Sequence, residues 1–106
     1  MAKNFIDYEK VERLSEGDSG VGIEKKVMKL FEEGGELSQA MLKYVKSPNV
    51  SASADVVDVR ALVMEECMDV TNVILDIVNA MGFNDDECKE MFDKKLNKWE
   101  AKQKRY

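Results

Sequence analysis

The stretches KLFEEGGEL, at residues 29–37, and EECMDV, at residues 65–70, decide how this chain of 106 residues folds. Each lies within a segment whose apolar residues recur at helical spacing. Carboxylates three positions apart on a helix share one face and lie one turn apart. Two such helices packed face to face would gather four carboxylates, a hard oxygen set that suits Mg²⁺ or Mn²⁺. The candidate metal ligands are Glu33, Glu36, Glu66 and Asp69.

An all-α fold of four helices joined by short polar segments is expected. Asn4 is the expected N-cap of the first helix and Gly17 its stop, Ser47-Pro48 ends the second helix, and Gly82 closes the third. Asn84-Asp85-Asp86-Glu87 has the form of a capping box with Asn84 as the cap. The expected helices are Phe5 to Ser15, Ile23 to Lys46, Asp55 or Val56 to Met81, and Asn84 to about Lys102.

Composition indicates a single domain over residues 1–106, because 44% hydrophobic and 35% charged content fits one compact core. A net charge of −5 argues against binding nucleic acid or a membrane over the whole surface. No apolar run reaches about 18 residues and the acidic start does not resemble a signal peptide, so we expect a cytoplasmic protein. A subunit this small buries a modest core, which makes homo-oligomerisation the expected way to complete the bundle.

The chain contains no histidine. This excludes the usual general base, the Ser-His and Cys-His arrangements and most zinc sites. It also excludes the ferritin-like di-iron bundles, which need Glu-x-x-His on two helices. Any catalysis must therefore use carboxylates, lysines and a metal ion.

Helical spacing separates the acidic residues of the second helix. Glu33 falls within the apolar arc, Glu36 at its edge and Glu32 on the far side. We expect Glu33 to be partly buried, and a buried carboxylate needs a cation or a shifted pKa. The apolar arc is expected to consist of Ile23, Val27, Leu30, Phe31, Leu37, Met41, Tyr44 and Val45.

The third helix carries an arc of acidic and amide residues on an otherwise apolar surface, and residues 61–81 contain no Lys or Arg. Solvated helix faces usually mix both signs of charge, so this arc indicates a cation site. Gly34 and Gly35, in mid-helix, each cost about 1 kcal/mol relative to alanine, which suggests close approach of a neighbouring helix or a ligand. The arc consists of Glu65, Glu66, Asp69, Asn72 and Asp76.

Together the two stretches resemble the signature of the MazG-like, all-α nucleoside triphosphate pyrophosphohydrolases. That signature is two glutamates, two spacers and a third glutamate, followed after a gap by Glu-x-x-Asp. Here its halves are Glu32 to Glu36 and Glu66 to Asp69, and the resemblance covers roughly residues 23–82. The leucine after the third glutamate and the valine after the aspartate are also frequent in the family.

The resemblance implies an enzyme that hydrolyses a nucleoside triphosphate between its α and β phosphates, giving a monophosphate and pyrophosphate. Glu33, Glu36, Glu66 and Asp69 would hold Mg²⁺ or Mn²⁺, and Glu32 would orient a ligand or a water. The family also implies a homodimer or a dimer of dimers, and a fourth helix that contacts phosphate. The candidate substrate-binding residues are Lys94, Lys95 and Asn97 on that helix, and Asn72.

Alternatives remain open from the residues themselves. The acidic clusters could form the solvated face of a non-catalytic helical module that binds a basic partner. A phosphoribosyl-ATP pyrophosphohydrolase is an alternative within the family. The lysines of the fourth helix could simply complement the negative end of its dipole. Phe92 and Trp99 share a stripe with Cys88 and Leu96, which indicates core or subunit packing rather than base stacking.

Overall fold

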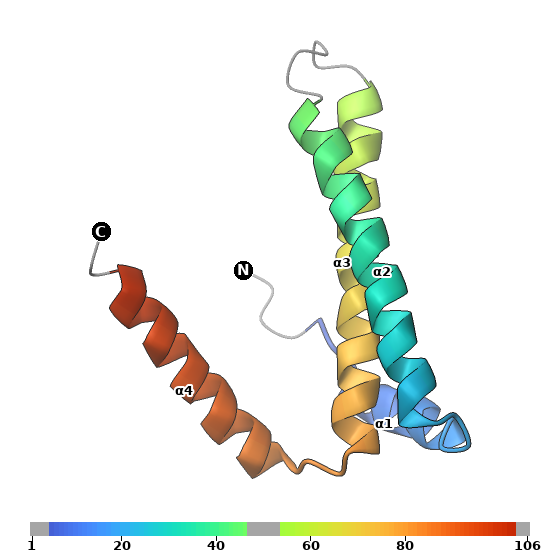
Figure 1. The fold of residues 1–106 in the computed structure, drawn as a ribbon, viewed down its shortest axis with the longest axis vertical. Coiled ribbons are helices and arrows are strands. Elements are labelled where there is room, and N and C mark those ends of the chain that lie inside the picture. Colours follow the sequence, from blue (N-terminus) through green and yellow to red (C-terminus); the bar gives the residue numbers. More distant parts are fainter. Residues whose placement is uncertain (1–4, 47–53, 104–106) are drawn as a thin grey trace.

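The computed structural model describes residues 5–46 and 54–103, with the backbone alone for 54–57. It confirms the all-α expectation, since these ranges contain four helices and no strand (Figure 1). None of the helices in the described part of the chain is long and apolar enough to cross a membrane. The helices are α1 (Tyr8–Gly17), α2 (Ile23–Lys46), α3 (Ala54–Ala80) and α4 (Asp85–Gln103).

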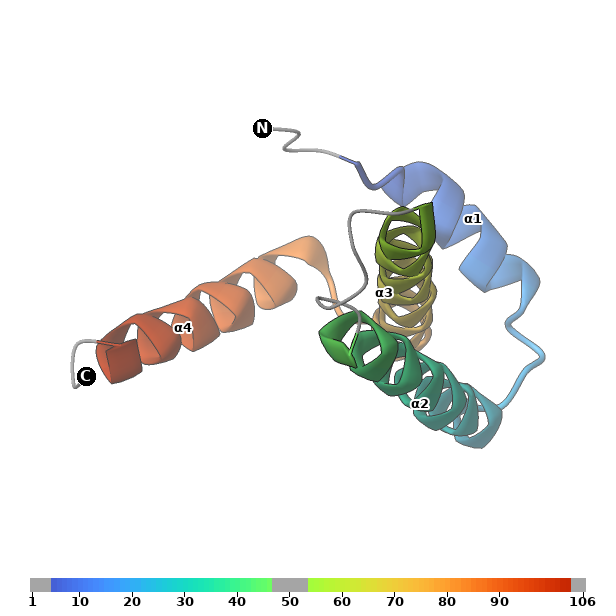
Figure 2. The ribbon, with the colours of Figure 1, turned by 90° about the horizontal axis from the view of Figure 1, so that it is seen from above.

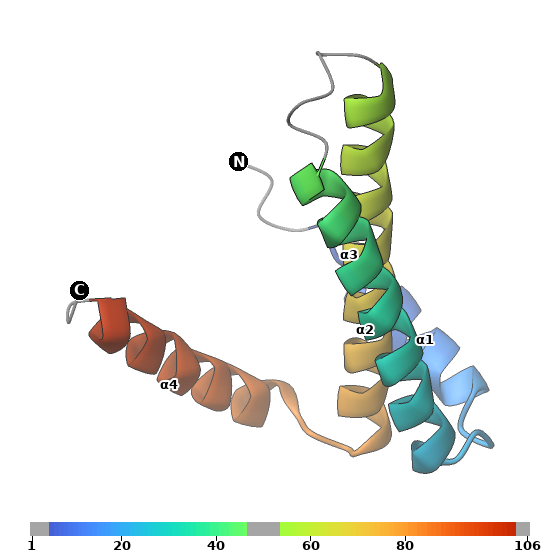
Figure 3. The same cartoon turned by 45° about the horizontal axis from the view of Figure 1, so that its top comes forward.

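The long helices α2 and α3 lie side by side and run antiparallel, and α1 packs on α3 near its C-terminal end (Figures 1 and 2). Over the described residues, α4 contacts none of the other three helices. It leaves the end of α3 and extends away from the hairpin in every view, as Figure 3 also shows. The structure therefore consists of a packed three-helix part and a separate fourth helix.

The helix boundaries follow the local sequence signals closely. The prediction for α2 is confirmed at both ends, and α3 and α4 agree within two residues. Gly82, with φ of 75°, terminates α3 as expected. The expected start of α1 at Phe5 is wrong, because Asp7 is the N-cap and accepts a hydrogen bond from the Lys10 N–H at 3.1 Å. The expected cap, Asn4, lies outside the described residues.

The predicted capping box at the start of α4 is confirmed. The Glu87 N–H donates to Asn84 Oδ1 at 2.8 Å, and the Asn84 N–H donates to Glu87 Oε1 at 3.1 Å. These reciprocal bonds satisfy two backbone groups that a helix start otherwise leaves unpaired. The beginning of α4 is thus fixed locally, without help from the other helices.

The centre of the three-helix part is polar. Asp76 of α3 accepts hydrogen bonds from Ser15 of α1 and from Lys26 of α2, whose Nζ lies 2.7 Å from Asp76 Oδ2. Ser15 and Lys26 are both buried. This Ser15–Asp76–Lys26 node ties three helices together and gives the Asp76 carboxylate its cation within the chain.

Few apolar side chains are buried. Within the described ranges Ala40, at 2% exposure, is the one apolar residue that is buried. The expected apolar arc of α2 is therefore only partly packed against α3, and Phe31 is 78% exposed. The chain exposes 9,100 Å² of surface, whereas a compact protein of its 12.1 kDa exposes about 6,000 Å². Its radius of gyration of 16.9 Å likewise exceeds the value of about 13 Å for a compact domain.

Candidate metal centre

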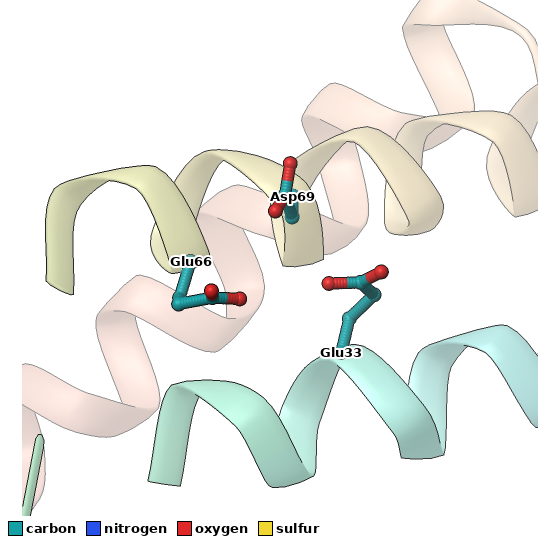
Figure 4. Close-up of side chains that lie close together, drawn as sticks. All are labelled: Glu33, Glu66 and Asp69. Atoms are coloured by element: carbon teal, nitrogen blue, oxygen red, sulfur yellow. The ribbon is translucent and has the colours of Figure 1, made fainter. Parts of the chain in front are cut away.

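Three carboxylates converge where α2 and α3 cross. Glu33 extends from α2 toward α3, where Glu66 and Asp69 stand one turn apart (Figure 4). One oxygen from each residue lies within 4.8 Å of the others. That spacing lets a single divalent cation contact all three residues.

Heptad spacing places Glu33 in this position. Lys26, Glu33 and Ala40 follow one another at seven-residue intervals and are the three buried residues of α2. Residues seven apart return to nearly the same side of a helix, so all three lie on the seam that faces α3. Glu33 is 7% exposed, so it is buried more completely than the partial burial that was expected.

Two of the carboxylate oxygens have no partner. Glu33 Oε2 and Glu66 Oε2 are buried and accept no hydrogen bond from the described residues. Buried polar atoms are nearly always hydrogen-bonded, because leaving one unpaired costs free energy. A cation between α2 and α3 would satisfy both oxygens at once, so the donor chemistry fits a hard divalent ion.

The other Glu33 oxygen is paired with Lys29. Lys29 Nζ lies 2.9 Å from Glu33 Oε1, one turn away on α2, and 3.8 Å from Glu32 Oε1. The hydrogen bond from Lys29 lowers the pKa of Glu33 and keeps it charged, while the same bond raises the pKa of Lys29. The long lysine side chain is half exposed, so it can leave Glu33 without breaking the fold.

The neighbouring carboxylates repel one another. Burial raises the pKa of Glu66, and the charges of Asp69 and Glu33 raise it further. The pKa of Glu36 is raised first by the charge of Glu33. Carboxylates whose pKa values rise through mutual repulsion are stabilised in their charged form by a shared cation.

The remaining predicted ligands lie around this group or away from it. Glu36 is exposed and stands outside the set of three convergent carboxylates, although its charge interacts with Glu33 and Glu66. Glu32 is also exposed, at the rim beside Lys29. Of the four predicted metal ligands, three therefore lie together, namely Glu33, Glu66 and Asp69.

The predicted substrate-binding residues do not reach the carboxylates within one chain. Lys94, Lys95 and Asn97 are exposed on α4, which contacts neither α2 nor α3. Asn72 is exposed and lines a cavity of about 290 Å³ between α1 and α3. A second cavity, of about 250 Å³, reaches Lys29. None of the three convergent carboxylates lines either cavity.

Sequence reasoning missed Lys26, Lys29 and Ser15. The signal for Lys26 was present, because it lies seven positions before Glu33 and so on the same seam. Lys29 is four positions before Glu33, the spacing of an intrahelical ion pair. Ser15 carried no such signal, since its contact with Asp76 depends on how α1 packs on α3.

Comparisons of this chain with family models, with curated proteins and with solved structures find no match.

Proposed function

We propose that this chain is a Mg²⁺-dependent pyrophosphohydrolase of nucleoside triphosphates. The observation that supports this most directly is the convergence of Glu33, Glu66 and Asp69, with two buried oxygens that lack a partner. A solvated acidic face would leave its carboxylates apart and in water. The resemblance of both sequence stretches to the MazG-like signature supplies the reaction class, and α2 and α3 carry those stretches side by side.

Each acidic residue has a defined part in the proposal. Glu33, Glu66 and Asp69 would hold the cation, and Glu36 would join them from the exposed edge. The chemistry supplied by bound Mg²⁺, or by Mn²⁺, is neutralisation of phosphate charge and acidification of the attacking water. Glu32, beside Lys29 at the rim, would orient the ligand or the water. Water would add across the α–β anhydride bond, releasing a nucleoside monophosphate and pyrophosphate.

The proposed enzyme acts as a homodimer or a dimer of dimers in the cytoplasm. Its surface of 9,100 Å² supports association, because about 3,000 Å² more is exposed than a compact monomer of this mass shows. Obligate interfaces commonly bury an area of that order. The exposed lysines of α4, which include Lys94 and Lys95, would contact the phosphates, and Asn72 would contact the nucleotide.

The test is pyrophosphate release from a panel of nucleoside and deoxynucleoside triphosphates, with and without Mg²⁺. Glu66→Gln removes a charged ligand of the centre and should weaken metal binding by about tenfold or more, and abolish the release. Glu65→Gln is the matched control, because Glu65 is the exposed neighbour outside the convergent group. Calorimetric titration with Mn²⁺ measures binding separately from turnover.

The competing proposal is a non-catalytic module whose acidic face binds a basic partner. The Lys29–Glu33 ion pair favours it, since it gives Glu33 a cation without any metal. In that case the wild-type protein binds Mn²⁺ no better than Glu66→Gln and releases no pyrophosphate. If the protein binds Mn²⁺ but releases pyrophosphate from none of the triphosphates, the proposed hydrolase activity is rejected. Only the proposal of a metal centre then stands.

A further inference from the structure

The cavity of about 250 Å³ that reaches Lys29 is rich in lysine. Lys25, Lys26 and Lys29 all line it, and all three come from the first two turns of α2. The acidic residues of its wall are Asp18 and Asp76. Lys26 and Asp76 neutralise each other across 2.7 Å, in the node that joins the three packed helices. The charge of the cavity therefore depends on Lys25, Lys29 and Asp18.

These three residues are exposed to water but differ in their partners. Within the described residues, Lys25 and Asp18 take part in no ion pair. Lys29 is held at 2.9 Å by Glu33, which does not line the cavity. The cavity thus has one unpaired lysine against one aspartate. Release of Lys29 from Glu33 would give it two lysines against one aspartate, and this positive charge would attract an anion.

The cavity adjoins the convergent carboxylates along both long helices. On α2, Lys29 comes four residues before Glu33. On α3, Val73, which also lines the cavity, comes four residues after Asp69. Four residues are about one helical turn, or about 6 Å along the axis. Because α2 and α3 run antiparallel, both steps lead in the same direction from the carboxylates, as Figure 1 shows. An anion in the cavity would lie about one turn from a cation held by them.

Glu33 links the two places. Its Oε1 accepts the hydrogen bond from Lys29, while its Oε2 is buried and has no partner among the described residues. A divalent ion on Glu33 would repel the Lys29 ammonium, because both charges are positive and close together. The ion has twice the charge and contacts three carboxylates, so Glu33 favours it over Lys29. The Lys29 side chain is 52% exposed and can turn toward the cavity that it already lines.

The size of the cavity limits what it can hold. Pockets for drug-sized ligands measure about 300–1,000 Å³, and this cavity is smaller. It suits a phosphate or diphosphate group better than a whole nucleotide. Lysine binds phosphate as a mobile point charge, which fits a side chain that changes partner.

We propose that Lys25 and Lys29 form a phosphate site in this cavity, and that Lys29 passes from Glu33 to the phosphate when a divalent ion binds Glu33. Lys29 thus holds the place of the ion in the metal-free protein. That the phosphate belongs to a nucleoside triphosphate rests on the proposed function. The site needs no residue of α4, whose lysines do not reach α2 or α3 within one chain. Metal and phosphate strengthen each other's binding, since both favour the same position of Lys29.

Calorimetric titration with Mn²⁺, in the absence and in the presence of inorganic phosphate, tests this coupling. For the wild-type protein, phosphate should raise the affinity for Mn²⁺ by about fivefold or more, as coupled sites commonly do. Phosphate also binds Mn²⁺ in solution, but that effect is the same for every variant. Comparing variants at one phosphate concentration therefore isolates the contribution of the lysines.

The two lysines should respond differently to substitution. Lys29→Met removes the competitor for Glu33, so without phosphate it should bind Mn²⁺ about two- to fivefold more tightly. Lys25→Met should change this affinity less, because Lys25 pairs with none of the described carboxylates. In both variants phosphate should lose most of its effect. Lys43→Met, on α2 but outside both cavities, is the matched control and should behave as wild type. Far-UV circular dichroism checks that each variant stays helical.

Two outcomes overturn the proposal. If Lys29→Met binds Mn²⁺ no more tightly than the wild type, Lys29 does not compete with the ion. If phosphate fails to raise the affinity of the wild type relative to Lys29→Met, the released Lys29 turns elsewhere, such as to Glu32 Oε1 at 3.8 Å. Either result can accompany pyrophosphate release from triphosphates, which leaves the proposed hydrolase standing. Coupling without pyrophosphate release supports the phosphate site and rejects the hydrolase.

Discussion

The three-helix part buries mainly polar side chains, whereas α4 buries none. Between α1, α2 and α3 the buried residues are mostly polar, with Ser15, Lys26 and Glu33 below one tenth exposed. On α4 no residue is buried, and its apolar stripe faces solvent. Polar contacts need defined geometry, whereas apolar burial supplies most of the free energy of folding. The comparison indicates that polar contacts fix how α1, α2 and α3 are arranged, while large apolar side chains of the described residues stay exposed.

The largest loss of stability is expected from a substitution in the Ser15–Asp76–Lys26 node. Asp76→Asn keeps the shape of the side chain but leaves the buried ammonium of Lys26 without an opposite charge. Breaking a buried ion pair on one side is strongly destabilising, and since Asp76 is partly exposed we expect a loss of about 2–3 kcal/mol in the free energy of unfolding. Urea denaturation followed by circular dichroism measures it.

The matched variant is Lys26→Met, which replaces the buried cation by an apolar chain of similar length. It should cost less than Asp76→Asn, because the carboxylate that remains can still reach water. If the two variants lose the same free energy of unfolding, then an unpaired Lys26 ammonium costs no more than an unpaired Asp76 carboxylate.

The same node predicts a pH dependence. Burial alone would raise the pKa of Asp76, but hydrogen bonds from Lys26 and Ser15 outweigh it, so the pKa lies below the ordinary value of 3.8. A lowered carboxylate pKa contributes stability that is present above the unfolded value and is lost as the pH falls through the folded value. The stability difference between wild type and Asp76→Asn should be constant at neutral pH and shrink below pH 3.8. A difference that grows in acid contradicts this assignment.

Local sequence signals were sufficient to predict where most of the helices begin and end. The span of α2 follows from its apolar spacing and from Ser47-Pro48, and the start of α4 follows from a capping box within four residues. The start of α1 was misjudged because Asp7 competes with Asn4 as a cap, and single residues decide where a short helix begins.

Contacts between helices were only partly predictable. The burial of Glu33 and its proximity to Glu66 follow from spacing on two neighbouring helices. The exposure of Phe31 does not, because α2 has apolar residues on two sides and periodicity cannot tell which side meets α3. The pairing of Asp76 with Lys26 joins residues fifty positions apart, which no local pattern encodes.

The next effect concerns the cap of α4. Asn84→Ala removes the acceptor of the Glu87 N–H and should weaken α4 by about 1 kcal/mol. Because α4 contacts no other helix of its chain, the loss should appear as faster amide exchange in the first turns of α4. Amide exchange in α2 and α3 should be unchanged. Equal acceleration in α2 would mean that α4 and the hairpin unfold as one cooperative unit within a chain.

The smallest loss of stability is expected at the Lys89–Asp93 ion pair of α4. This pair resembles the buried Lys26–Asp76 pair only in the distance between its charged atoms. Lys89 Nζ lies 2.9 Å from Asp93 Oδ2, close to the 2.7 Å of the Lys26–Asp76 pair, but both of its side chains are more than half exposed. Water already solvates these charges and salt screens them, so Asp93→Asn should cost no more than about 0.5 kcal/mol. Urea denaturation at low and at high salt measures this. A loss near that of Asp76→Asn would mean that the distance between charges, rather than burial, sets the strength of ion pairs in this protein, and the contrast between its two regions would then have no energetic basis.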